Sequence, residues 1–330
     1  MPSSLYARRL AVLVVLSIAC TGIQADEGMW TFDSPPLSVL KAKYDFAPPP
    51  GWLDHLRLAS VRFNDGGSGS FISPGGLVLT NHHVALDQLQ KISTPQINYV
   101  RDGFYAARRD QEIKSTDLEL NVLVSFENVT SRIEGKALDA RKQAIAAIEK
   151  DSLEKTGLRS DVVPLYQGSE YWLYRYKKYT AVRLVFAPEQ QIAFFGGDPD
   201  NFTYPRYDLD FAVFRVYENN QPIAPRDYLK WNLKGAADGE LVFVSGHPGS
   251  TDRLDTVAQL ETERDVVSPI SIDVIRRRLT VLRSYAGRGA EQARQAAGLI
   301  FQLENALKAL GGEYDGLRED RKSTRLNSSH

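Results

Sequence analysis

Two adjacent histidines and two downstream aspartates are the residues of this chain best suited to catalysis. His82 and His83 follow the segment GSGSFISPGGLVLTN, and Asp210 stands directly before the apolar run FAVFRVY. An imidazole steadied by a carboxylate can act as the general base for a hydroxyl nucleophile. Asp208 lies two residues from Asp210 and would share its strand face, so spacing alone does not separate the two carboxylates.

Metal binding is an alternative role for the histidine pair. At the end of the strand predicted here, neighbouring side chains point to opposite faces, so His82 and His83 would not easily share one ion. The chain contains neither an HExxH motif nor a Cys/His spacing typical of zinc sites. We therefore expect no metal and no cofactor. Taken alone, either histidine is ordinarily a packed or surface residue.

Short strands and tight turns must position these residues. The segment around Pro74 predicts a hairpin, with apolar residues on both arms and a Pro-Gly-Gly turn. The run Leu118–Phe126 alternates apolar with polar or small residues, as a half-buried strand does. AVRLVFA, DLDFAVFRVYE and GELVFVSG predict further strands, and Ala137–Lys155 predicts one helix. Many short strands with Gly and Pro turns favour a barrel or a sandwich.

Beyond about Asp255 the strand pattern stops. Val257–Leu317 is rich in Arg, Gln, Ala, Leu and Glu and predicts two or three helices, with breaks near Gly287, Gly298 and Gly311. A change from strands to helices partway along the chain predicts a separate helical domain or a large helical insertion.

The two ends of the chain do not resemble parts of a fold. Arg8 and Arg9 precede the apolar run Leu10–Ala19, and Ala25 ends a short polar stretch, which is typical of a secretory signal peptide over residues 1–25. Processing as a lipoprotein at Cys20, the only cysteine, is the alternative. At the other end, residues 320–330 resemble the translation of a sequencing adapter. We expect them not to be native, and the natural protein to continue after Glu319.

Composition excludes some partners. The 330 residues carry a formal net charge of -1, with 43% hydrophobic and 25% charged residues. This balance gives no electrostatic basis for binding nucleic acid or an anionic membrane surface. No run after the predicted signal peptide is long and apolar enough to span a membrane.

Several segments carry a closer resemblance. GSGSFISPGGLVLTNHHV resembles the histidine segment of trypsin-like proteases. Together with DEGMW, STPQINYVRDGFYAA, GGDPDNFTYPR, DLDFAVFRVY and GHPGSTDR, in this order, it resembles the exported bacterial family of dipeptidyl-peptidases 7 and 11. The resemblance implies a mainly β fold: a chymotrypsin-like double β-barrel with an inserted α-helical domain. Residues 26–255 would form the barrel portion, and residues 256–319 the start of the helical domain.

The resemblance also assigns roles to residues. His83 matches the catalytic histidine and Asp210 the aspartate of a catalytic triad. Asn201 matches an asparagine that binds the free α-amino group of the substrate, beside Phe202, where the family often has tryptophan. Asn305 matches a second amine-binding asparagine.

The site departs from the family in two further ways. Val84 stands where cysteine is usual. No serine lies in a GNSG- or GDSG-like turn: Ser68 and Ser70 precede the histidines, and Ser245 and Ser250 flank GHPG. Triad order in this class is histidine, aspartate, serine, so we expect the nucleophile in sequence that follows these residues.

The resemblance therefore implies an exported serine dipeptidyl-peptidase of the periplasm or medium. It would act on peptides with a free N-terminus and could form a homodimer, and this chain alone would be inactive. The alternatives are an HtrA-like endopeptidase, against which the helical region after Asp255 argues, and a catalytically dead protease-fold binding protein.

Overall fold

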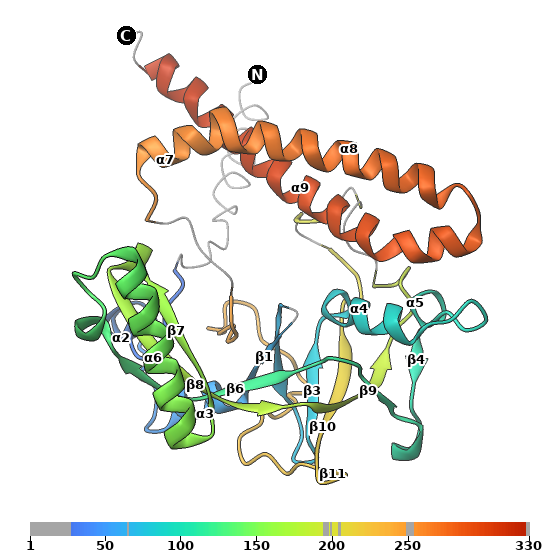
Figure 1. Ribbon diagram of the computed structural model, residues 1–330, viewed down its shortest axis with the longest axis horizontal. Coiled ribbons are helices and arrows are strands. Elements are labelled where there is room, and N and C mark those ends of the chain that lie inside the picture. Colours follow the sequence, from blue (N-terminus) through green and yellow to red (C-terminus); the bar gives the residue numbers. More distant parts are fainter. Residues whose placement is uncertain are drawn as a thin grey trace, which may run out of the picture. The chain divides into compact units, whose positions relative to one another are not determined.

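The computed structural model describes residues 28–64, 66–193, 198, 200–203, 206–248 and 254–327 (Figure 1). The predicted signal peptide, with Cys20, lies outside these residues, as do Ser250 and His330. The chain divides into two compact units. One contains residues up to 48 together with 232–244, and the other contains residues 49–231 and 245 onward.

The smaller unit contains helix α2 (Leu37–Tyr44) and an irregular segment. The rings of Phe46 and Phe243 lie 5.3 Å apart within it. The strand predicted over GELVFVSG is wrong, because residues 240–245 have no regular structure. Val242 and Val244 remain 63% and 99% exposed. Strand preference depends on packing against neighbours, and these valines lack it in the described part of the chain.

The larger unit is built on one antiparallel sheet. Its strands are β1 (Ser60–Phe63), β2 (Ser68–Phe71), β3 (Leu77–Thr80), β4 (Phe104–Tyr105), β5 (Ile113–Lys114), β6 (Leu120–Asn128), β7 (Arg159–Leu165), β8 (Glu170–Tyr179), β9 (Ala181–Ala187), β10 (Ala212–Glu218) and β11 (Gln221–Pro222). The main order is β4-β9-β10-β3-β2-β1-β6-β8-β7; β5 pairs with β9, and β11 with β10.

The strand predictions on either side of the histidines are confirmed. The hairpin is β2 and β3, with Ser70 opposite Leu79, and the other predicted strands correspond to β6, β9 and β10. At the hairpin turn Gly76 has φ +73°, and a Cβ there would lie 3.1 Å from the carbonyl oxygen of Val216. Glycine is therefore required at that position for both conformation and space.

The described part of the larger unit also contains helices. They are α3 (Trp52–Ala59), α4 (His82–Ile92), α5 (Tyr99–Asp102), α6 (Leu138–Thr156), α7 (Val257–Thr262), α8 (Ser268–Ala286) and α9 (Ala290–Asn327), with three 3₁₀ turns, Arg109–Gln111, Thr130–Arg132 and Tyr166–Gly168, and a π-helical turn, Glu263–Val267, that joins α7 to α8. None of the described helices is long and apolar enough to cross a membrane.

Two fold expectations need correction. Helix makes up 43% and strand 21% of the structure, so the fold is mixed rather than mainly β. Within the described residues the eleven strands form one antiparallel sheet. Gly298 and Gly311 do not break α9, since a helical glycine costs only about 1 kcal/mol and α9 packs against α8.

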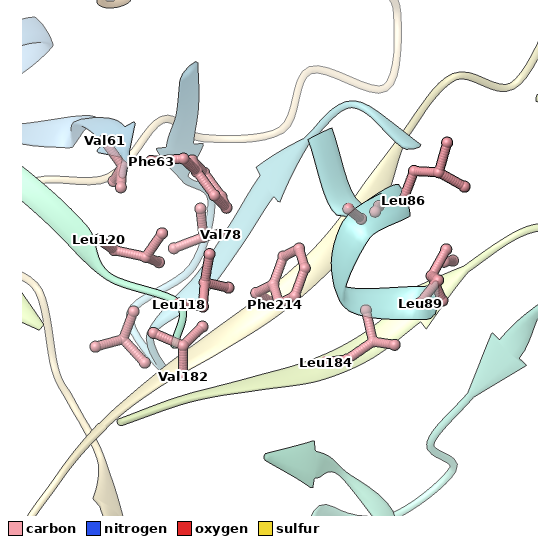
Figure 2. Close-up of a cluster of buried hydrophobic side chains, with 14 of the residues drawn as sticks. Val61, Phe63, Val78, Leu86, Leu89, Leu118, Leu120, Val182, Leu184 and Phe214 are labelled. Atoms are coloured by element: carbon pink, nitrogen blue, oxygen red, sulfur yellow. The ribbon is translucent and has the colours of Figure 1, made fainter. Parts of the chain in front are cut away.

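The core connects the sheet to α4. Figure 2 shows Leu86 and Leu89 of α4 in the same buried cluster as Phe214 of β10 and Leu184 of β9. Burying each such side chain contributes about 1.5–3 kcal/mol. Phe301 of α9 belongs to this cluster too. The sheet thereby holds α4 in place, and with it the residues at the start of α4.

Candidate active site

His83 lies at the beginning of a helix, directly after a strand. β3 ends at Thr80, Asn81 has the extended backbone of an N-cap residue, and α4 begins at His82. The prediction that the two histidines end a strand is therefore wrong. They occupy the first turn of α4, whose position the core determines.

Asp210 lies directly opposite this turn. β10 pairs with β3 so that Ala212 faces Thr80, and the continuing backbone brings Asp210 beside His83. The distance from Nδ1 of His83 to Oδ2 of Asp210 is 2.7 Å. The backbone N–H of His83 donates to Oδ1 of Asp210 over 3.0 Å. The same carboxylate thus binds both the ring and the backbone of one histidine.

The electrostatics keep this carboxylate charged. Burial raises the pKa of the Asp210 carboxyl, but the hydrogen bonds and positive charge of His83 outweigh it, and the net effect lowers that pKa. The Asp210 side chain is 11% exposed, whereas that of His83 is 36% exposed. The imidazole is therefore held from behind while part of it stays open to solvent. This arrangement suits a general base.

Asp208 has a different partner. Its Oδ2 accepts from Nε of Arg206 over 2.8 Å, and Nη2 of Arg206 donates to Asp198 over 2.7 Å. An open pocket of about 410 Å³ is lined by Gln191, Ile192, Asp198, Asp200, Arg206, Tyr207 and Asp208. The structure thus separates the two carboxylates that spacing could not: Asp210 meets the histidine, and Asp208 meets an arginine.

The structure also brings together the predicted amine-binding residues. Asn201 is 1% exposed, and its Nδ2 donates to Oδ1 of Asn305 on α9 over 3.0 Å. The neighbouring Phe202 is 62% exposed and has a left-handed backbone with φ +61°. Residues more than a hundred positions apart thus meet, beside an exposed aromatic ring. Gly196, Gly197 and Pro199 of the same motif lie outside the described residues.

His82, the other histidine of the pair, is buried. It is 1% exposed, and burial lowers the pKa of its ring, against a raising effect from Asp210. In the described ranges of the chain, no group of three or more His, Cys, Asp or Glu side chains could hold a metal ion. The ring of His83 instead contacts the carboxylate of Asp210.

Comparison with known proteins identifies the family. The sequence model for Peptidase S46 matches residues 25–329 of this chain. The chain belongs to the Peptidase S46 family. The resemblance to dipeptidyl-peptidases 7 and 11 is confirmed at the level of this family.

Curated S46 relatives are about 30% identical to this chain. Dipeptidyl-peptidase 7 of Capnocytophaga gingivalis is 31% identical over 282 residues, which cover 79% of this chain and 39% of that protein. The Asp/Glu-specific dipeptidyl-peptidase of Porphyromonas gingivalis is 32% identical over 283 residues, which cover 75% of this chain and 39% of that protein. The S46 chain therefore spans about 40% of the length of these relatives.

The S46 fold is also seen in solved structures. A crystal structure of Porphyromonas endodontalis DPP11 in complex with dipeptide Arg-Glu superposes with a TM-score of 0.76 at 25% identity, covering 92% of this chain and 48% of that chain. The described fold is thus DPP11-like over the part that this S46 chain spans.

Sequence reasoning missed one participant in the S46 site. Nδ2 of Asn81 donates to the backbone oxygen of Asp210 over 3.0 Å and to its Oδ2 over 3.1 Å. Its place between a strand and the histidines was a usable signal, because asparagine is a preferred N-cap residue. The partner it would bind was not readable from the sequence.

Proposed function

We propose that this chain supplies the general base and its orienting carboxylate to a serine-type dipeptidyl-peptidase. The observation that carries the proposal is the 2.7 Å contact between Nδ1 of His83 and Asp210. A carboxylate on Nδ1 keeps a proton on that nitrogen, leaves Nε2 as the base, and stabilises the imidazolium that forms when a hydroxyl is deprotonated. Asp210 acts here as the anchor and His83 as the base.

The nucleophilic serine, in this proposal, comes from outside these 330 residues. Three described serines have structural partners of their own. Ser245 lies 2.9 Å from Ser60 Oγ, Ser68 accepts from the backbone of His247, and Ser268 donates to Glu263. The chain spans 39% of each of two curated relatives, which leaves room for a serine elsewhere. The chain alone should then be inactive.

We assign Asn201 and Asn305 to the α-amino group of the substrate, with Phe202 beside it. Their amide oxygens can accept from an ammonium group, and burial of Asn201 removes competing water. A hydrogen bond to a charged group contributes about 1.5–3 kcal/mol, so losing one would weaken binding roughly 10- to 150-fold. Anchoring the N-terminus at a set distance from His83 would count residues and release dipeptides.

The substrates, on this proposal, are peptides with free N-termini. Curated relatives carry the names dipeptidyl-peptidase 7 and Asp/Glu-specific dipeptidyl-peptidase, and we carry over only their shared dipeptidyl-peptidase activity. We also propose export by the N-terminal signal peptide to the periplasm or medium. A homodimer would be the working form of the complete protein.

Hydrolysis of paired reporters tests this function. The polypeptide extended by the remainder of its gene should cleave dipeptidyl reporters with free N-termini and reject acetylated ones, and its His83→Ala variant should be inactive. Equal rates on both reporters would refute the dipeptidyl-peptidase proposal and favour an HtrA-like endopeptidase. No hydrolysis by the extended polypeptide would favour a binding protein. Hydrolysis by the 330-residue chain itself would refute the external serine.

A further inference from the structure

Asn81 occupies an N-cap position but does not cap its own helix. It precedes α4 with an extended backbone of φ -79° and ψ 153°, and its side chain makes no capping hydrogen bond. Its amide is instead turned to Asp210, donating to the backbone oxygen over 3.0 Å and to Oδ2 over 3.1 Å. One side chain thus fixes both the main chain and the carboxylate of Asp210.

Asp210 performs the capping that Asn81 leaves undone. The backbone N–H of His83, in the first turn of α4, donates to Oδ1 of Asp210 over 3.0 Å. Asn98 before α5 shows the ordinary arrangement, since its Oδ1 accepts from the backbone N–H of Arg101 over 3.1 Å. The two asparagines hold the same helix position but use opposite ends of the amide group, one as donor and the other as acceptor.

We propose that Asn81 is a positioning residue that holds the Asp210 carboxylate against Nδ1 of His83. Oδ2 of Asp210 receives both the ring of His83 and the amide of Asn81. Which nitrogen of a histidine carries the proton is set by the hydrogen bond that its ring makes. Asn81 therefore keeps His83 in the tautomer with the proton on Nδ1. The effect on catalysis rests on the function proposed above, whereas the effect on the tautomer does not.

The surroundings make the effect of Asn81 separable from packing. Asn81 is exposed, so shortening its side chain leaves no buried cavity. The ionisable groups that act on the Asp210 carboxylate are His83 and His82. Neither changes when residue 81 is substituted. A change in the His83 ring would then be due to the missing amide.

The test substitutes Asn81 with serine and measures the tautomer of His83. Serine caps helices about as well as asparagine, but its single short hydroxyl cannot bridge both acceptors on Asp210. Nitrogen NMR of the labelled chain at neutral pH should show the proton of His83 on Nδ1 in the wild type. In Asn81→Ser the ratio of the Nδ1–H to the Nε2–H tautomer should fall about tenfold, the loss of one charge-assisted hydrogen bond at an exposed site.

Asn98→Ser is the matched control, because it changes an N-cap asparagine that does not touch Asp210, and it should leave the His83 tautomer unchanged. An unchanged tautomer in Asn81→Ser, or an equal change in Asn98→Ser, would overturn the positioning role. In the extended polypeptide, Asn81→Ser should lower kcat about tenfold with KM unchanged. If Asn81→Ser shifts the tautomer of His83 but the extended wild-type polypeptide hydrolyses no reporter, the proposed function is refuted. The positioning role of Asn81 then still stands.

Discussion

Acid should destabilise this protein through the half-buried histidine His247. Its backbone N–H donates to Oγ of Ser68 over 2.7 Å, and its ring lies 6.2 Å from that of Tyr176. Nε2 of His247 is enclosed and has no hydrogen-bond partner among the described residues. Burial, with a smaller contribution from the positive charge of Arg62, lowers the pKa of His247 from 6.5 to about 4. The ring is therefore neutral in the folded protein.

The size of the effect follows from this pKa. The unfolded chain protonates His247 near pH 6.5, whereas the folded protein resists until about pH 4. Between these values the unfolded state binds more protons, so stability falls as the pH falls. A gap of about 2.5 pH units corresponds to about 3 kcal/mol. This contribution is complete above pH 6.5 and is lost below about pH 4.

Urea unfolding at a series of pH values measures the contribution of His247 to the free energy of unfolding. The free energy of unfolding of the wild type should drop between pH 7 and pH 4 by about 3 kcal/mol more than that of His247→Gln, which cannot titrate there. His55→Gln retains His247 and should keep the wild-type drop. Parallel pH profiles for the wild type and His247→Gln would show that the ring is not buried in its neutral form, and the reasoning would fail.

Four further substitutions test the site and the core. In the extended polypeptide, Asp210→Asn should lower kcat about 10⁴-fold, because an amide favours the wrong tautomer of the histidine; steady-state kinetics measures this, and a loss below tenfold would contradict it. Asn201→Ala and Asn305→Ala should each reduce the preference for free over acetylated reporters about 10- to 150-fold, and a preference unchanged in both would contradict the amine site. Nε of Arg215 lies 2.8 Å from Oε1 of Glu112, so Glu112→Gln leaves this arginine without its buried counter-charge. A denaturant titration should show the free energy of unfolding lowered by about 3–5 kcal/mol. A loss below 1 kcal/mol would show that the pair is not desolvated.

The sequence was most informative where local patterns determine structure. The hairpin before the histidines depends on a turn whose Gly76 needs a positive φ, and such turn chemistry is readable from a few residues. The helix predicted at Ala137–Lys155 is α6 (Leu138–Thr156), because helix formers at helical spacing need little tertiary support. The strands at β9 and β10 were predictable from their runs of apolar residues.

Features that depend on distant partners were not readable. The sequence predicts a strand end where the first turn of α4 lies. Burial of Leu86 and Leu89 against the sheet, rather than local preference, stabilises this helix, so a local pattern does not reveal it. The choice between Asp208 and Asp210 depended on Arg206 binding one of them. The resemblance suggested residue roles, and the structure shows which of those residues meet. Their roles in catalysis stay predictions.

The hydrogen bond between Asn201 and Asn305 joins a loop near the sheet to a long helix. If these two amides select the length of the released peptide, neither segment can do so alone. The selection then depends on how stably α9 packs. A substitution that weakens the packing of α9 would then first change the products to peptides of mixed length, while peptide-bond cleavage continued. The length of the released peptide and the rate of cleavage could then be changed independently by substitution.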